Sequence, residues 1–224
     1  MYHKRANVKN FSEDERSMGT IKYIVLHYDG NNGATARNNV DYFARAGVGA
    51  SAHYFIDENE IALSVPWYYT AWHCGAMKYT HPDCRNHNSI GIELCSKRYK
   101  DGAYYFEPNT VIRAASLVRS LMETFQIPLK NVVRHYDVTG KNCPAPWVDN
   151  NEWGEFLRLV EDKPKEVNTM KYYEKVVEIP QGEQREVVNK LVERGIIKGT
   201  SNGLHLSEDM VRILTYLDRT GIFK

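Results

Sequence analysis

Strand-like and helix-like segments alternate along residues 1–160 of this chain. The apolar, strand-like segments are 21–28, 52–57, 61–65, 89–95 and 132–135. The segments with apolar residues at helical spacing are 34–46, 109–125 and 151–160. Two of the strand-like segments flank the polar turn residues at 57–59 and predict a hairpin. The alternation as a whole predicts an α/β fold with a mixed central sheet flanked by helices.

The composition changes at residues 161–170, which are mostly charged and offer little to bury. This segment is predicted to be a linker. It would join a larger domain at residues 1–160 to a small, mainly helical C-terminal domain at 171–224. A lone core of that size is marginal, so the small domain is expected to pack on the first domain or on a second copy of itself.

Within the C-terminal segment the pattern predicts a strand at 172–179 and helices at 183–194 and 207–220. Ser207 is the expected N-cap of the second helix, because its hydroxyl can accept a hydrogen bond from the first turn. The apolar residues that this helix is expected to bury are Met210, Ile213, Leu214 and Leu217.

Two of the predicted strands end at histidines, His27 and His135, and Cys143 follows the second one in a loop that contains Gly140. Two imidazoles and a thiolate form a ligand set that suits zinc. Three protein ligands leave a tetrahedral ion one open position for water or substrate. The alternative is that both histidines are ordinary strand-end residues and that Cys143 is a buried thiol. Spacing alone leaves both interpretations open, because the three residues are far apart in sequence.

Composition argues against several classes of function. The formal net charge is +1, so nothing points to nucleic acid as a partner. No apolar run approaches the roughly 20 residues that cross a bilayer, so no membrane span is expected. Residues 1–20 are polar and contain no apolar signal segment, which predicts a product made in the cytosol.

The other cysteines are Cys74, Cys84 and Cys95. Cys95 ends a strand-like segment and is most simply a small buried side chain. Cys74 and Cys84 are close in sequence and could form a disulfide in an oxidising compartment, whereas in the cytosol they would stay reduced. A second metal site that uses them together with His73 and His81 is the less favoured alternative.

Four motifs occur in one order along the chain: YIVLHY at 23–28, ASAHYFID at 50–57, NSIGIEL at 88–94 and RHYDVTGKNCP at 134–144. Together they resemble the zinc-dependent N-acetylmuramoyl-L-alanine amidases (amidase type 2) of bacteriophage endolysins and bacterial autolysins. Peptidoglycan recognition proteins of animals share that fold. The resemblance covers residues 20–160 and is specific only when the four motifs are taken jointly.

The resemblance implies roles for five residues. His27, His135 and Cys143 match the ligands of a Zn²⁺ cofactor. Glu93 matches the acidic residue that acts as general base, and Lys141 matches a lysine that stabilises the tetrahedral oxyanion. Without the resemblance, Glu93 would be read as an exposed strand residue and Lys141 as a solvated loop lysine.

The resemblance also implies substrate contacts. His73 and Trp72 match a Trp-His loop that lines the groove in relatives. His53 stands where some relatives have a tyrosine that supports the transition state, so the chain departs from the pattern here. We expect His53 to contact substrate or water instead.

The implied substrate is peptidoglycan, at the amide between N-acetylmuramic acid and L-alanine of the stem peptide. The absence of a signal segment fits an endolysin that waits in the host cytoplasm, reaches the cell wall after holin-type release and lyses the cell. A bacterial autolysin of the same activity is one alternative, a non-catalytic peptidoglycan-recognition module is another, and a structural zinc protein is a third. The C-terminal domain faintly resembles modules appended to such enzymes, which implies a secondary cell-wall ligand. A homodimer formed through this domain is the competing idea.

Overall fold

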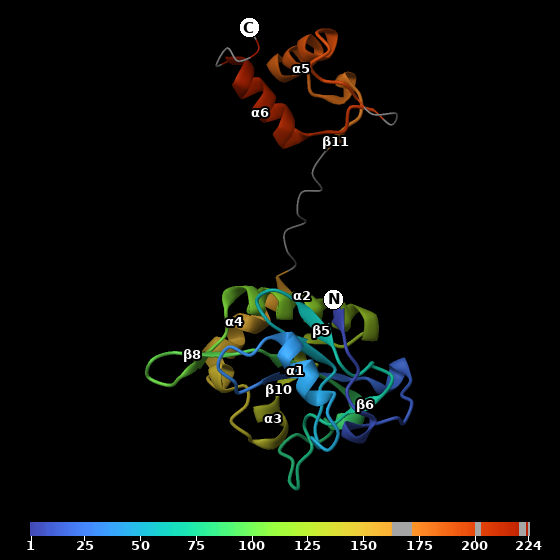
Figure 1. Ribbon diagram of the computed structural model, residues 1–224, viewed down its shortest axis with the longest axis vertical. Coiled ribbons are helices and arrows are strands. Elements are labelled where there is room, and N and C mark those ends of the chain that lie inside the picture. Colours follow the sequence, from blue (N-terminus) through green and yellow to red (C-terminus); the bar gives the residue numbers. More distant parts are fainter. Residues whose placement is uncertain (163–171, 200–202, 220–222, 224) are drawn as a thin grey trace. The chain divides into compact units, whose positions relative to one another are not determined.

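The computed structural model describes residues 1–162, 172–199, 203–219 and 223, so residues 163–170 of the expected linker lie outside the described residues. The chain divides into two compact units, Met1–Asp162 and Lys163–Lys224 (Figure 1). Each unit is described by itself below. None of the helices in the described ranges is long and apolar enough to cross a membrane.

A six-stranded sheet forms the centre of the first unit, in the order β1-β5-β4-β7-β3-β10. These strands are β1 (Tyr2–His3), β3 (Tyr23–Tyr28), β4 (Tyr54–Ile56), β5 (Ile61–Leu63), β7 (Ser89–Leu94) and β10 (Val132–Arg134). The neighbours β4, β7, β3 and β10 run parallel, whereas β4 and β5 form the predicted antiparallel hairpin. The expected mixed sheet is therefore confirmed. Two small sheets pair β2 (Phe11–Ser12) with β6 (Thr70–Ala71) and β8 (Lys97–Arg98) with β9 (Tyr104–Tyr105).

The α-helices of this unit are α1 (Ala36–Phe43), α2 (Pro108–Phe125), α3 (His135–Thr139) and α4 (Asn150–Glu161). Short 3₁₀ helices lie at Val8–Asn10, Met18–Thr20, Asn86–Asn88, Leu129–Asn131 and Ala145–Trp147. The helix expected at 34–46 is shorter, because Thr35 is its N-cap and accepts a hydrogen bond from the Asn38 amide. Pro108 occupies the first turn of α2, where its missing N–H is not needed.

Alternation along β3 sends its side chains into two different clusters. Ile24 and Leu26 join the main core, which packs the sheet against α2 and α4 (Figure 1). Tyr23 and Val25 point to the opposite face, into a smaller cluster that contains Cys74 and Cys84. Because successive strand residues face opposite ways, His27 belongs to the second face, away from α2 and α4. This strand is buried on both faces, as is usual for a central parallel strand.

The second unit has its own small core, formed by Tyr173, Ile179, Val188, Leu206 and Val211. Its elements are β11 (Tyr172–Tyr173), the 3₁₀ helix Val176–Glu178, α5 (Glu183–Glu193), β12 (Leu206–Ser207) and α6 (Glu208–Arg219). β11 and β12 pair antiparallel. The predicted cap is present, because the Met210 amide donates to Ser207 Oγ at 3.1 Å.

Two expectations for this unit are wrong. The strand expected at 172–179 ends at Tyr173, and the chain turns into a 3₁₀ helix three residues later. The expected buried face of α6 is wrong for part of the helix only, because Leu214 packs against the small core as expected. Met210 and Ile213 are 46% and 57% exposed, whereas Val211 is fully buried in the core.

Candidate metal and catalytic site

The register of the sheet brings His27 and His135 to the same edge. β10 runs parallel to β3 with Arg134 opposite Leu26, so the residue that follows each lies at the carboxyl end of its strand. His27 is the next residue of β3, and His135 begins α3. Their rings are 4.7 Å apart between centroids. Both side chains are buried, with 1% and 5% of their surface exposed.

Cys143 returns to these histidines through the loop after α3. The turn passes Gly140, whose φ of 79° lies in the left-handed region that glycine adopts without strain. The loop is closed where the Tyr136 amide donates to the Cys143 carbonyl at 2.7 Å. Cys143 Sγ then lies 3.7 Å from His27 Nδ1. The ligand atoms of His27, His135 and Cys143 all lie within 4.8 Å of one another.

The unpaired atoms of this cluster fit a metal ion. His27 Nε2 lies 3.0 Å from His73 Nδ1, which leaves His27 Nδ1 to face the thiol. His135 Nδ1 is buried with no hydrogen-bond partner among the described residues. A buried polar atom without a partner is rare and requires an explanation, such as an ion. Two nitrogens and a sulfur are the donor set that zinc prefers.

Protonation also suits a cation at this place. Burial lowers the pKa of His27 well below its usual value and lowers the pKa of His135 to about 4. Both rings are therefore neutral at physiological pH, as metal ligands must be. Burial raises the pKa of the Cys143 thiol to about 12, so this thiol needs a nearby cation to become a thiolate.

Glu93 lies beside the three residues because β7 pairs with β3 in the register that places Glu93 opposite His27. Its Oε1 is 4.0 Å from His27 Nδ1, and 17% of its side chain is exposed. Its Oε2 is buried with no partner among the described residues. Burial, and to a lesser extent the Asp29 carboxylate, raise the pKa of Glu93 to about 8 against the opposing effect of Lys141. A carboxyl group with such a pKa can exchange a proton near neutral pH.

Lys141 is exposed and follows Gly140 in the same loop. With Glu93 it lines a cavity of about 600 Å³, whose other walls include Tyr28, Asp29 and residues of α1. A substrate in this cavity would meet a carboxyl group and an ammonium group together. Glu93 thus connects the two features: it lines this cavity with Lys141, and it lies beside His27 of the cluster that His27, His135 and Cys143 form.

His73 and Trp72 of the Trp-His loop both make hydrogen bonds inside the protein. His73 is 91% buried, and its ring is held between His27 and the hydroxyl of Ser89, whose Oγ is 3.1 Å from Nε2. Gly91 permits this position, because a Cβ there would lie 2.4 Å from the His73 ring. Trp72 is half-buried and its indole nitrogen donates to Ser12 Oγ at 2.9 Å. The structure therefore places His73 against a candidate metal ligand, and the expected substrate contacts of His73 and Trp72 stay predictions.

The expectation for His53 is corrected. His53 is fully buried, and its Nδ1 accepts a hydrogen bond from the Gly91 amide at 3.0 Å. Its Nε2 lies 2.8 Å from Arg16 Nη2. Burial, and then the Arg16 charge, lower the pKa of His53 well below its usual value. Both nitrogens are used inside the protein, so His53 supports the sheet and does not face the cavity.

Three residues that sequence analysis did not single out support the site. Asp29 follows β3 directly and accepts hydrogen bonds from the amide and hydroxyl of Ser96, at 3.0 and 2.8 Å. Asn39 of α1 donates to its other oxygen at 3.1 Å. Arg16 donates to the carbonyl oxygens of Trp67, Asn86, His87 and Ser89. Asp29 had one visible signal, its place directly after a strand that ends in a candidate ligand.

Cys74, Cys84, Cys95 and Cys143 are all free, buried thiols, so the structure contains no bond between Cys74 and Cys84. Within the described ranges, His27, His135 and Cys143 form the one group that could hold a metal. The alternative second site, with His73, Cys74, His81 and Cys84, is not such a group within those ranges. His81 Nδ1 instead accepts hydrogen bonds from the amides of Asp83 and Cys84.

Comparison with known proteins supports the same assignment. Residues 17–146 match the N-acetylmuramoyl-L-alanine amidase family. The chain belongs to this amidase family. The N-acetylmuramoyl-L-alanine amidase BlyA of Bacillus subtilis (strain 168) is 36% identical over 159 residues, which are 65% of this chain and 42% of BlyA. The chain thus spans less than half the length of that relative.

Solved structures of similar proteins confirm the predicted fold. A mutant of PlyL aligns with a TM-score of 0.60 and 27% identity, covering 73% of this chain and 99% of the PlyL chain. A mutant endolysin from Bacillus subtilis aligns with a TM-score of 0.57 and 29% identity, covering 71% and 97% of the two chains. The amidase fold therefore accounts for the first unit.

Proposed function

We propose that this chain hydrolyses the amide between N-acetylmuramic acid and L-alanine in peptidoglycan. Family membership and the names of the relatives support the reaction. The observation that carries the proposal is the meeting of His27, His135 and Cys143 next to Glu93 at an open cavity. A recognition module without activity would not need a carboxyl group beside three metal-binding side chains.

The proposed cofactor is Zn²⁺, held by His27, His135 and Cys143. When bound, the ion would supply Lewis acidity toward the scissile carbonyl oxygen and toward water. His73 would fix the orientation of His27, because His73 Nδ1 is the hydrogen-bond partner of His27 Nε2, the ring nitrogen that faces away from Cys143. Ser89 in turn would fix His73 by its hydroxyl.

Glu93 is the proposed general base and acid. Its carboxylate would take a proton from the attacking water and then give it to the leaving amine of L-alanine. The unpaired Oε2 and the raised pKa support this role, because the group is free to bind and release a proton. Lys141 would stabilise the oxyanion of the tetrahedral intermediate from the exposed side of the same cavity.

The proposed biological role is that of an endolysin. One matched structure is itself named an endolysin, which supports this role for the present chain. The enzyme would be made in the host cytoplasm, reach the cell wall after holin-type release and weaken it from inside. We further propose that residues 1–160 are the catalytic domain, that 161–170 are the linker, and that 171–224 bind the wall.

The test is to incubate purified cell walls with the full chain in the presence of zinc. The expected result is a loss of turbidity with new L-alanine amino termini and without new reducing ends. Cys143→Ala and Glu93→Gln should abolish the new termini. Cys95→Ala is the matched control, since Cys95 is also a buried thiol but no candidate ligand, and it should stay active. Release of reducing ends alone, or undiminished release by Cys143→Ala, would overturn the proposal.

A further inference from the structure

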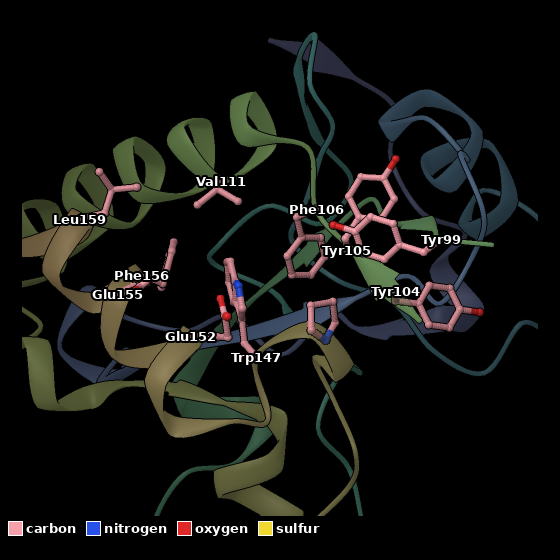
Figure 2. A pocket seen from close by; sticks show the side chains of 11 residues that line it. Tyr99, Tyr104, Tyr105, Phe106, Val111, Trp147, Glu152, Glu155, Phe156 and Leu159 are labelled. Carbon is pink, nitrogen blue, oxygen red and sulfur yellow. The ribbon is translucent and has the colours of Figure 1, made fainter. Parts of the chain in front are cut away.

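A second cavity of about 550 Å³ lies apart from the catalytic residues (Figure 2). It is enclosed by the β8–β9 hairpin, the start of α2, the 3₁₀ helix Ala145–Trp147 and α4. Its floor consists of Phe106, Trp147 and Phe156, which are 9%, 5% and 2% exposed. Trp147 stacks on Phe156 with 4.4 Å between ring centroids. The floor is therefore a rigid aromatic surface.

Trp147 also presents an unused hydrogen-bond donor. Among the described residues none accepts a hydrogen bond from its indole Nε1, although the side chain is 95% buried. This indole nitrogen is not completely enclosed by protein atoms, so a molecule in the cavity can reach it. Figure 2 shows the indole extending into the cavity between Phe106 and Phe156. A buried tryptophan usually finds a partner for its N–H, and here that partner would be a ligand.

The rim adds an exposed ring face and two acceptors. Tyr99 is 57% exposed and stacks on Tyr105, with 4.2 Å between centroids and 24° between ring planes. Glu152 and Glu155 are exposed on α4, and no described residue forms an ion pair with either of them. No lysine or arginine lines the cavity. The cavity thus offers an apolar floor, one donor, carboxylate acceptors and a flat aromatic platform.

We propose that this cavity binds an N-acetylhexosamine of the glycan strand, an inference that rests on the proposed function. Such a sugar uses every feature of the cavity. Its acetyl methyl group suits the aromatic floor, and its amide oxygen accepts from Trp147 Nε1. Its amide N–H and hydroxyls donate to Glu152 and Glu155, and its ring stacks on Tyr99. An ammonium group would use the carboxylates and rings but would leave the indole N–H without a partner.

The position of the cavity suits a polymer that also reaches the catalytic residues. Tyr104 lines this cavity, and its hydroxyl donates to the Gly30 carbonyl at 2.6 Å. Its ring contacts that of Tyr28, with 5.1 Å between centroids. Tyr28 in turn lines the catalytic cavity with Glu93 and Lys141. A lining residue of each cavity is therefore in contact with a lining residue of the other, as expected if one glycan strand reaches both.

Direct binding tests the ligand class on the full chain. The probes are β-1,4-linked tetramers of N-acetylglucosamine, of glucose and of glucosamine, measured by titration calorimetry. We expect binding of the acetylated tetramer and at least tenfold weaker binding of the glucose tetramer. Trp147→Phe, which keeps a ring but removes the donor, should weaken binding about fivefold. Glu152→Gln should weaken it less, and Glu161→Gln, on the same helix but outside the cavity, should leave it unchanged.

Tyr99→Ala keeps the test valid if Trp147→Phe does not fold, because Tyr99 is at the surface. It should weaken binding of the acetylated tetramer about tenfold. Three results would overturn the proposal: no binding of this tetramer, equal binding by Tyr99→Ala, or tighter binding of the glucosamine tetramer. The last result would identify a cation site instead.

Activity separates this inference from the proposed function. Tyr99→Ala should raise the KM for long glycan strands that carry stem peptides several-fold. It should leave kcat on the strands, and kcat/KM on a single muramyl peptide, unchanged. An unchanged KM on strands would refute the sugar site alone. No hydrolysis of either substrate by the unaltered chain would refute the proposed function, while the binding measurement would still stand.

Discussion

At the scale of single residues, burial determines the chemistry of the histidines in this chain. His27 and His135 are kept neutral by burial and present free nitrogens to Cys143. His53 is equally buried, but its nitrogens are taken by Gly91 and Arg16. His73 lies between these two groups and contacts His27. Four histidines of similar burial therefore have different roles, which their hydrogen-bond partners decide.

The contact of His73 with His27 leads to a prediction for metal affinity. His73→Asn should lower the affinity for zinc about 10- to 100-fold, because the hydrogen bond that orients a ligand is lost. His87→Asn is the control, since His87 is exposed and lies outside the site. Competition with a zinc chelator measures both variants. Equal affinity in His73→Asn and the unaltered chain would show that His73 does not position the ligand.

The neutral state of His53 predicts a dependence of stability on pH. The unfolded chain binds a proton at His53 below pH 6.5, whereas the folded chain does not, because burial lowers the pKa of His53. The contribution of His53 to the free energy of unfolding is therefore fully present above pH 6.5 and is lost as the pH falls below it. Between pH 7.5 and 5 the unaltered chain should lose up to about 2 kcal/mol more than His53→Gln. Denaturant unfolding at both pH values measures the difference, and equal losses would contradict it.

At the scale of elements, strand register determines what the site contains. β10 and β7 flank β3, so His135 and Glu93 meet His27 from both sides. The apolar runs were sufficient to predict these strands, whereas the meeting of the ligands was predicted only through the resemblance of the four motifs to a known family, because the three residues are far apart in sequence. The sequence was not sufficient for His53, because its partner Arg16 is 37 positions away and nothing local indicates that contact. The same holds for the part of the buried face of α6 that was wrongly expected, which only its packing against the small core reveals.

Replacing a glycine by alanine is predicted to change the free energy of unfolding in opposite directions in β7 and in α4. Gly91→Ala in β7 should destabilise the chain by about 1–3 kcal/mol, because the new Cβ would lie 2.4 Å from His73. Gly154→Ala in α4 should stabilise it by about 0.5–1 kcal/mol, since the nearest atom is 3.9 Å away and alanine favours a helix. Thermal unfolding compares the two. Equal midpoints for Gly91→Ala and the unaltered chain would contradict the close packing at His73.

At the scale of the whole molecule, the chain has two compact units with separate cores. The core of the second unit is small, so it supplies little stability by itself. We predict that a chain ending at Asp162 hydrolyses a soluble muramyl peptide as fast as the full chain. It should sediment with intact walls at least tenfold less. Both chains carry Glu93→Gln in the sedimentation assay, so that they do not digest the walls during the measurement. Equal adsorption of the two chains would contradict a wall-binding role for the second unit.

The central claim is that three side chains hold one catalytic ion, and metal content tests it most directly. The full chain, dialysed against buffer with trace zinc, should retain one zinc ion per chain. Cys143→Ala should retain less than a tenth of that amount, and Cys95→Ala should match the unaltered chain. Equal zinc in the Cys143→Ala variant and the unaltered chain would contradict the account.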